Sequence, residues 1–149
     1  MSTQRESADR LKELAKSGDI EEVIRLLGTV GEWLTNAQET ALVEAARNQH
    51  TGVVTALLDD GASPDGIGGG GFGLFTPLHL AARHRNADLL TLLLERGAET
   101  DAIESRTGRT PLHEVLGKGY EEETHLPLVR MLLEAGADPN RQASSLSKQ

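Results

Sequence analysis

The chain has 149 residues and a net charge of −8 at pH 7, because 23 Asp and Glu residues outweigh 15 Lys and Arg residues. This acidity disfavours general binding to nucleic acid or to an anionic membrane, so we expect neither partner, although a local basic patch is compatible with it. The chain has no cysteine, which excludes a disulfide framework and a thiolate metal site, and no apolar run long enough for a signal peptide or a membrane span. We therefore predict a cytoplasmic protein.

Two helices are predicted at the start of the chain. Leu11 and Ala15 belong to the apolar face of the first helix, and residues 18–27 (GDIEEVIRLL) supply the second. Asp19 followed three residues later by Glu22 is typical of a capping box, which indicates where the second helix begins. The same order of two helices is predicted again at residues 40–61, where the triplet TAL is followed by two alanines and then by a second apolar helix.

The third and fourth helix pairs each open with the tetrapeptide TPLH, at residues 76–79 and 110–113. A threonine hydroxyl caps a helix well, and proline costs nothing at the first helical position, where its missing N–H has no intrahelical partner. Gly97 and Gly136 are predicted to end the second helices in the left-handed conformation that glycine adopts without strain.

These elements form a repeat. The corresponding positions Asp9, Thr40, Thr76 and Thr110 lie 31, 36 and 34 residues apart, which is close to the ankyrin period of about 33 residues. From about Asp9 to Arg141 the chain therefore resembles the ankyrin-repeat family, most clearly through the two TPLH copies. The resemblance implies an all-α repeat fold, an α-solenoid of helix-turn-helix units joined by extended β-hairpin-like fingers.

The register of the repeats predicts a single domain. We assign residues 1–8 to an N-terminal extension, residues 9–141 to the ankyrin-repeat domain and residues 142–149 to a flexible tail. Within the domain we place the repeats at about residues 9–39, 40–75, 76–109 and 110–141. The resemblance also implies a binding scaffold without catalysis, whose partners meet the finger tips and the concave face of the first helices.

The finger between the second and third copies departs from the family pattern. Residues 65–75 (DGIGGGGFGLF) form a longer connection with six glycines. An apolar tip on a flexible connection is a candidate contact surface, so we predict that Ile67, Phe72 and Phe75 bind a partner. The alternative is that the apolar residues at its end fold back over the neighbouring helix. The glycines spell GxGxxG but follow a repeat turn instead of a strand, so we predict no dinucleotide site.

A row of basic side chains is predicted on the concave face. Lys16, Arg47 and Arg83 hold one repeat position, directly after the small residues of each first helix, and stacking would align them. The row continues at the next position and in the finger before the fourth copy, through His84, Lys118, Arg106 and Arg109. Such a row suits an acidic peptide or a carboxylate-rich protein surface. The alternative is that basic residues are common at this position because it is exposed to solvent.

Five extra residues lie between the helices of the fourth copy, at about residues 120–127 (YEEETHLP). We predict an acidic loop there, which either contacts a basic partner or is simply solvated. Tyr120 is a further candidate anchor, because aromatic side chains are common at interfaces. The last helix, at residues 126–135, has no further repeat to cover it, so we expect a monomer or a weak dimer through that helix.

We predict a non-enzymatic protein–protein interaction module that binds one protein partner, an enzyme or a toxin, and inhibits it by occlusion. Two alternatives remain within this class: a bacterial toxin-immunity protein, and a regulator similar to the cyclin-dependent kinase inhibitors. A further alternative is a structural self-assembling unit. The sequence has no catalytic motif and no metal-ligand spacing, so we predict no cofactor, no metal and no enzymatic activity.

Overall fold

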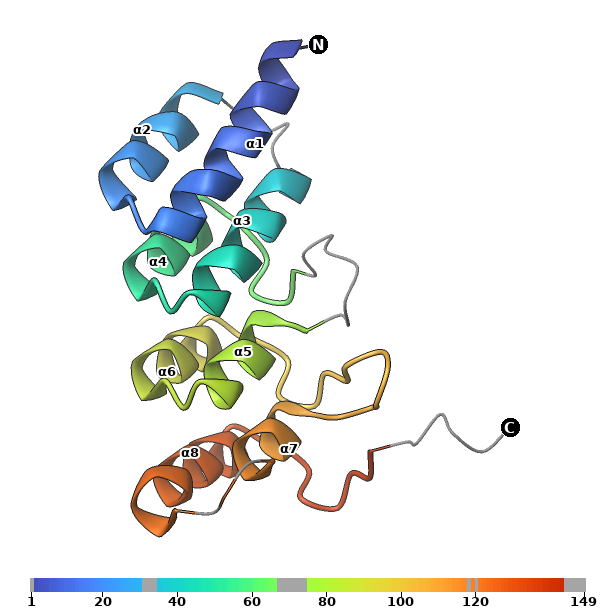
Figure 1. Cartoon of the computed structure of the whole chain (residues 1–149). Coiled ribbons are helices and arrows are strands. Elements are labelled where there is room, and N and C mark those ends of the chain that lie inside the picture. The colour runs from blue at the N-terminus through green and yellow to red at the C-terminus, as the bar shows by residue number, and fades with distance from the viewer. Residues whose placement is uncertain (1, 31–34, 67–74, 118, 120, 144–149) are drawn as a thin grey trace.

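The structure, a computed structural model, describes residues 2–30, 35–66, 75–117, 119 and 121–143. Within these residues the chain forms eight helices in four consecutive pairs (Figure 1). The first helices of the pairs form an inner layer of α1 (Ser2–Ser17), α3 (Thr35–Arg47), α5 (Pro77–Arg83) and α7 (Pro111–Leu116). The second helices form an outer layer of α2 (Ile20–Val30), α4 (Thr51–Asp59), α6 (Ala87–Glu95) and α8 (Glu122–Glu134). Each helix packs against its pair partner and against the next helix of its layer, which confirms the all-α repeat fold.

The core lies between the two layers and consists mainly of leucine and alanine. Leu57, Leu93 and Leu132, which hold the same place in three successive repeats, are all 0% exposed. The small side chains of the inner layer are fully buried as well: Ala41, Ala45, Ala46, Ala81 and Ala82. Because alanine is small, the two helices of a pair approach closely. None of the helices in the described ranges is both long and apolar enough to cross a membrane.

The TPLH copies begin their helices as predicted. Thr76 and Thr110 cap α5 and α7, and each hydroxyl accepts the backbone N–H of the histidine three residues later. Proline follows at the first helical position in both. The left-handed glycines are also confirmed, since Gly97 has a φ of +82° and Gly136 a φ of +102°. These caps explain why the third and fourth repeats have well-defined helix ends.

α1 and α3 begin earlier than the repeat register predicts. Thr40 lies inside α3 instead of capping it, and its Oγ1 donates to the Asn36 carbonyl oxygen at 3.0 Å. Residues 2–8, which we assigned to an N-terminal extension, form the start of α1. In α5 and α7 proline at the first helical position prevents extension toward the N-terminus. Arg10 and Ala41 stand at the corresponding positions of α1 and α3 and set no such limit. The domain boundaries themselves stay a prediction.

The acidic loop predicted at residues 120–127 is wrong for most of its length, because α8 begins at Glu122. α8 has 13 residues, whereas α4 and α6 have 9 each. Glu122 and Glu123 lie in the first turn, where carboxylates interact favourably with the partial positive charge of a helix N-terminus. The extra residues of the fourth repeat therefore lengthen a helix.

Some of the predicted finger residues lie outside the described part of the chain. These are Ile67, Phe72, Lys118 and Tyr120. Since the described residues contain no strand, the β-hairpin-like form of the fingers also stays a prediction.

Candidate functional site

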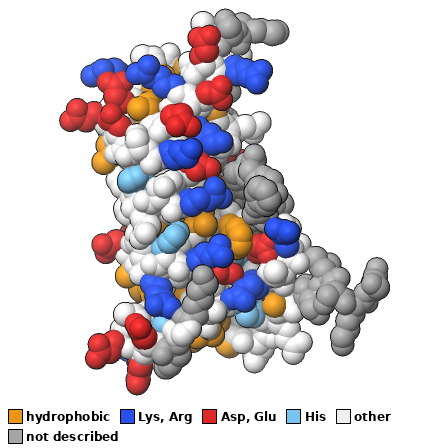
Figure 2. Space-filling model, in the orientation of Figure 1, with side chains coloured by type: hydrophobic (Ala, Val, Ile, Leu, Met, Phe, Trp, Pro, Cys, Tyr) orange, Lys and Arg blue, Asp and Glu red, His pale blue; other side chains and the backbone are white. Residues whose placement is uncertain are grey.

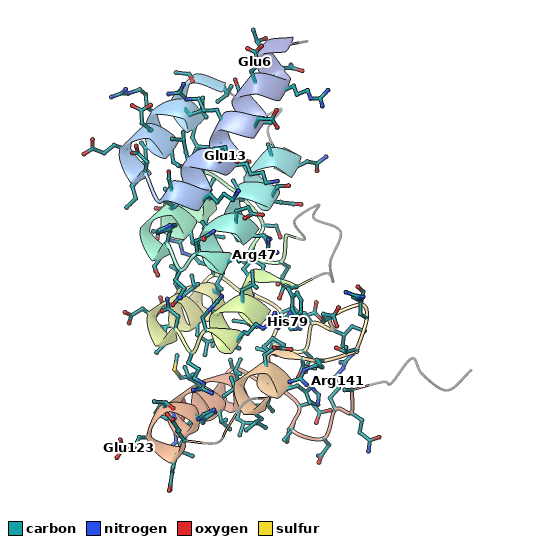
Figure 3. The ribbon with its side chains drawn as sticks, viewed as in Figure 1. Glu6, Glu13, Arg47, His79, Glu123 and Arg141 are labelled. Carbon is teal, nitrogen blue, oxygen red and sulfur yellow. The ribbon has the colours of Figure 1, made fainter. Side chains whose placement is uncertain are left out.

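Six of the predicted partner-binding residues are described, and the structure brings three of them together. Phe75, Arg83 and Arg109 meet between α5 and α7, around the carboxylate of Glu114. We refer to these four residues as the inner cluster. The other three are exposed, with Arg47 at the end of α3 (Figure 3), His84 at the end of α5 and Arg106 in the connection between α6 and α7.

A buried histidine fixes the place of the inner cluster. His79, the last residue of the first TPLH copy, lies on α5, where Figure 3 labels it. Its exposed fraction is 0%. Its Nδ1 accepts the backbone N–H of Thr76 at 3.3 Å, and its Nε2 lies 2.9 Å from the carbonyl oxygen of Arg109. Because a carbonyl oxygen only accepts hydrogen bonds, Nε2 carries the proton and the ring is neutral. The imidazole therefore ties the third repeat to the connection that leads into the fourth.

Phe75 is half-buried and packs on the helix that follows it. Its ring centroid lies 5.9 Å from that of His79, edge to face at 76°, and 5.1 Å from the guanidinium carbon of Arg83. Phe75 thus folds back over α5, which is the alternative that the sequence pattern left open. A cation above an aromatic face is favourable, so the ring also orients the guanidinium of Arg83.

Glu114, which sequence reasoning missed, joins two arginines. Its side chain is 9% exposed, and its carboxylate lies 2.9 Å from Arg109 Nε and 3.9 Å from Arg83 Nε. Arg109 also donates from Nη2 to the carbonyl oxygen of His113 at 2.6 Å. The guanidinium of Arg109 is therefore held by the protein, whereas Arg83 has a 45% exposed side chain and a longer contact. The sequence did contain a signal that could have indicated Glu114: it is a glutamate directly after TPLH, at the position where the third repeat has Leu80.

A second buried carboxylate organises the connection between α6 and α7. Glu104 is 2% exposed and accepts hydrogen bonds from the N–H of Arg106 (2.9 Å) and from the N–H and hydroxyl of Thr107 (2.8 and 2.6 Å). Its own N–H donates to the Arg109 carbonyl oxygen at 2.8 Å. Burial alone would raise the pKa of the Glu104 carboxyl, but these hydrogen bonds outweigh burial and hold the pKa below its ordinary value. The ionised carboxylate therefore fixes the turn that carries both arginines.

The predicted basic row is interrupted by carboxylates of the same helices. Lys16 Nζ lies 3.8 Å from Glu13, and Arg47 Nη1 lies 3.2 Å from Glu44. Figure 2 shows basic and acidic side chains intermixed along this face. The four inner helices carry six basic and six acidic residues, whereas the four outer helices carry two basic and eight acidic residues. The inner helices are thus balanced in charge, and the negative excess of the helices lies on the outer layer.

The inner layer also contains a polar hollow of about 470 Å³ between the N-terminal halves of α1 and α3. Its lining combines amide, hydroxyl and charged groups with the methyl groups of two alanines, from Gln4, Arg5, Ala8, Asp9, Lys12, Asn36, Ala37 and Thr40. The hollow depends on the parts of α1 and α3 that extend beyond their predicted starts, so the repeat register could not predict it. Nowhere in the described ranges do three His, Asp or Glu side chains come together in a way that would hold a metal ion.

The fold and the cluster define a class of protein: a helical repeat stack whose inner layer presents charged groups between repeats. Comparison with protein families agrees, since residues 38–67 match the ankyrin repeat and residues 67–143 match a model of three ankyrin repeats. The chain belongs to the ankyrin-repeat family. α1 and α2 precede the matched residues and continue the same stack. The sequence matched no curated protein. Ankyrin repeats generally mediate protein–protein interaction and are typically not enzymes.

His79 makes stability depend on pH. Burial lowers the pKa of its imidazole below the ordinary value of 6.5, although the Arg109 carbonyl opposes this shift. The unfolded chain then binds the proton more readily than the native protein. The contribution of His79 is therefore complete above about pH 6.5 and is lost as the pH falls through the lowered pKa. We expect urea denaturation to show a free energy of unfolding that declines below about pH 6.5 by up to about 1.4 kcal/mol per pH unit.

A variant without this imidazole provides the control for the pH dependence. His79→Gln should flatten the decline, and an unchanged slope in that variant would contradict the assignment. Glu104 does not interfere, because its pKa lies below 4.5 and its contribution is lost only as the solution becomes more acidic than that.

Proposed function

We propose that this chain binds one protein partner, an enzyme or a toxin, through its inner layer and fingers, and inhibits that partner by covering its surface. The observation that carries the proposal is the inner cluster. Arg83 is 45% exposed there and stands over Phe75. Arginine is among the commonest anchors of protein interfaces, and a surface arginine positioned by its neighbours is suited to that role.

The geometry of the cluster favours an acidic surface on the partner. Glu114 is bonded to Arg109 at 2.9 Å, while Arg83 Nε stays 3.9 Å away, beyond hydrogen-bond distance. The N–H donors of Arg83 therefore suit an additional carboxylate, which a guanidinium binds with two parallel hydrogen bonds. Phe75 restricts the guanidinium before binding, so less side-chain entropy is lost when a ligand arrives.

We expect Arg83→Glu to lower recovery of the partner in affinity capture from lysate of the source organism. Reversal of one interface charge weakens binding by at least about tenfold. Arg130→Glu makes the same change on an exposed position of α8, in the outer layer, and should leave recovery unchanged. Mass spectrometry identifies the protein whose recovery depends on Arg83. Equal recovery with both variants would refute the inner cluster as the binding surface.

The identity and activity of the captured protein decide the kind of inhibition. A toxin that loses its activity in the complex makes the chain an immunity protein, and a kinase that does so makes it a regulator similar to the cyclin-dependent kinase inhibitors. A partner that keeps full activity when bound would remove inhibition from the proposal and leave binding alone.

A second candidate function, self-assembly, is favoured by the end of the stack. Leu126 and Leu133 of α8 are each 41% exposed, and no further helix follows α8 in the described residues. Exposed apolar side chains on a terminal helix suit a two-fold contact with a second copy. Light scattering over a range of concentrations tests this function, and a constant monomer mass would exclude it.

A further inference from the structure

An apolar groove lies on the outer layer, between α2 and α4. It has a volume of about 380 Å³ and is lined by Ile24, Leu27, Gly28, Ala56, Asp59 and Asp60. We refer to it as the outer groove. Four of its six residues are apolar or glycine, and the other two are carboxylates from the C-terminal end of α4.

The apolar part of the outer groove is open to solvent. Ile24 is 56% exposed, and Ile20, one turn earlier on α2, is 42% exposed. At Gly28, one turn later, a Cβ would have no side chain or separate backbone of the described residues within 4 Å. These positions repeat once per helical turn, about every 5.4 Å along α2, which is the spacing at which another helix presents its side chains.

The surroundings of the outer groove are acidic. Asp59 binds Arg96 through one oxygen at 2.6 Å, and Asp60 accepts from the Gln38 amide through one oxygen at 2.5 Å. Both aspartates remain exposed. Arg25, the one basic residue of α2, is paired with Glu22 on the same helix. With eight acidic and two basic residues on the outer helices, this face attracts cations and repels carboxylates.

We propose that the outer groove binds an amphipathic helix of a second protein. Large aliphatic side chains of that helix fill the space beside Ile24, and Lys or Arg residues next to them face Asp59 and Asp60. This is the helix-in-groove mode of recognition, with anchors at i, i+3, i+4 and i+7. The outer groove lies on the outer layer and the inner cluster on the inner layer, so the two surfaces are separate. The inference does not rest on the function proposed above.

The test uses the full chain and a fluorescein-labelled peptide of about four helical turns, with Leu at the four anchor positions and Lys elsewhere. An isomer with Glu in place of Lys is the charge control. Ile24→Asp changes the outer groove, and Ile103→Asp makes the same substitution at a 50% exposed isoleucine in the connection between α6 and α7. Both variants add one negative charge, so non-specific attraction for the Lys peptide rises equally in both.

We expect fluorescence anisotropy to show binding of the Lys peptide that Ile24→Asp weakens by at least about tenfold and Ile103→Asp does not weaken. The Glu peptide should not bind. Arg83→Glu should leave binding of the Lys peptide intact, which separates this inference from the function of the inner cluster. Equal affinities for both isoleucine variants, or binding of the Glu peptide, would overturn the proposal.

Two further measurements keep the test decisive. Gly28→Leu adds a side chain at the open end of the groove, where a Cβ has no described neighbour within 4 Å, so it should weaken peptide binding even if Ile24→Asp fails to fold. A molecular mass that rises with concentration in the wild type but not in Ile24→Asp would show that a second copy of the chain occupies the groove. That result would overturn the proposal that a different protein binds there.

Discussion

Replacing His79 by alanine is expected to lower the free energy of unfolding by about 2 to 4 kcal/mol, which is the range for a buried group that loses several hydrogen bonds. The imidazole is 0% exposed and links the Thr76 N–H to the Arg109 carbonyl oxygen. Its removal leaves a buried donor without its partner and opens a cavity. Urea denaturation at neutral pH measures the change.

The other histidines provide internal controls for this prediction. His84 is exposed at the end of α5, so His84→Ala should change stability by less than about 0.5 kcal/mol. His113 makes the same local bonds to Thr110 but is only half-buried, so His113→Ala should fall between the two. Equal losses for His79→Ala and His84→Ala would show that the bond between repeats contributes little.

Leu93→Ala is expected to lower the free energy of unfolding by about 2 to 5 kcal/mol, because it removes buried methyl groups and leaves a cavity. Leu93 is 0% exposed on α6, and α6 packs against α4 on one side and α8 on the other. Thermal and urea denaturation both report the loss. Leu133→Ala, at a 41% exposed position of α8, should cost less than about 1 kcal/mol.

The position of Leu93 within the stack gives this prediction a second readout. The stability of a repeat array is approximately a sum of repeat terms and nearest-neighbour interface terms. A cavity in α6 should therefore speed hydrogen exchange in α4 and α8 as well. Leu132→Ala places the same change in the last outer helix, which has a neighbour on only one side among the described helices, so its effect should stay nearer the C-terminal repeat. Identical exchange patterns for the two variants would contradict coupling through α6.

Local signals predicted the second half of the fold well. TPLH contains its own cap, its own proline and its own histidine, so the starts of α5 and α7 follow from four consecutive residues. The starts of α1 and α3 could not be predicted in this way, because no proline limits these helices toward the N-terminus. Their length depends on the packing of the two helices against each other. The acidic run before Pro127 was assigned to a loop because the five extra residues of the fourth repeat fall between its two predicted helices, yet its glutamates suit the first turn of α8.

The site was predicted less completely than the fold. The repeat position indicated Arg83, and the finger before the fourth copy added Arg109. Glu114, which joins them, became visible only when α5, α7 and the connection before α7 were placed together. The same holds for Glu104, whose partners depend on the shape of a turn. The outer groove has no sequence motif at all, because it arises from two helices of different repeats.

The unequal charge of the helices in the two layers contributes an electric dipole across the short axis of the stack. Among the described helices the outer layer is strongly negative and the inner layer is neutral, so the field differs from one side to the other. An approaching protein is rotated by this field before any contact forms. Over a screening length of about 10 Å at 0.1 M salt, that rotation acts only during the last part of the approach. The two faces of the chain therefore differ in how often a given partner reaches them in the right orientation, even before binding strength is compared.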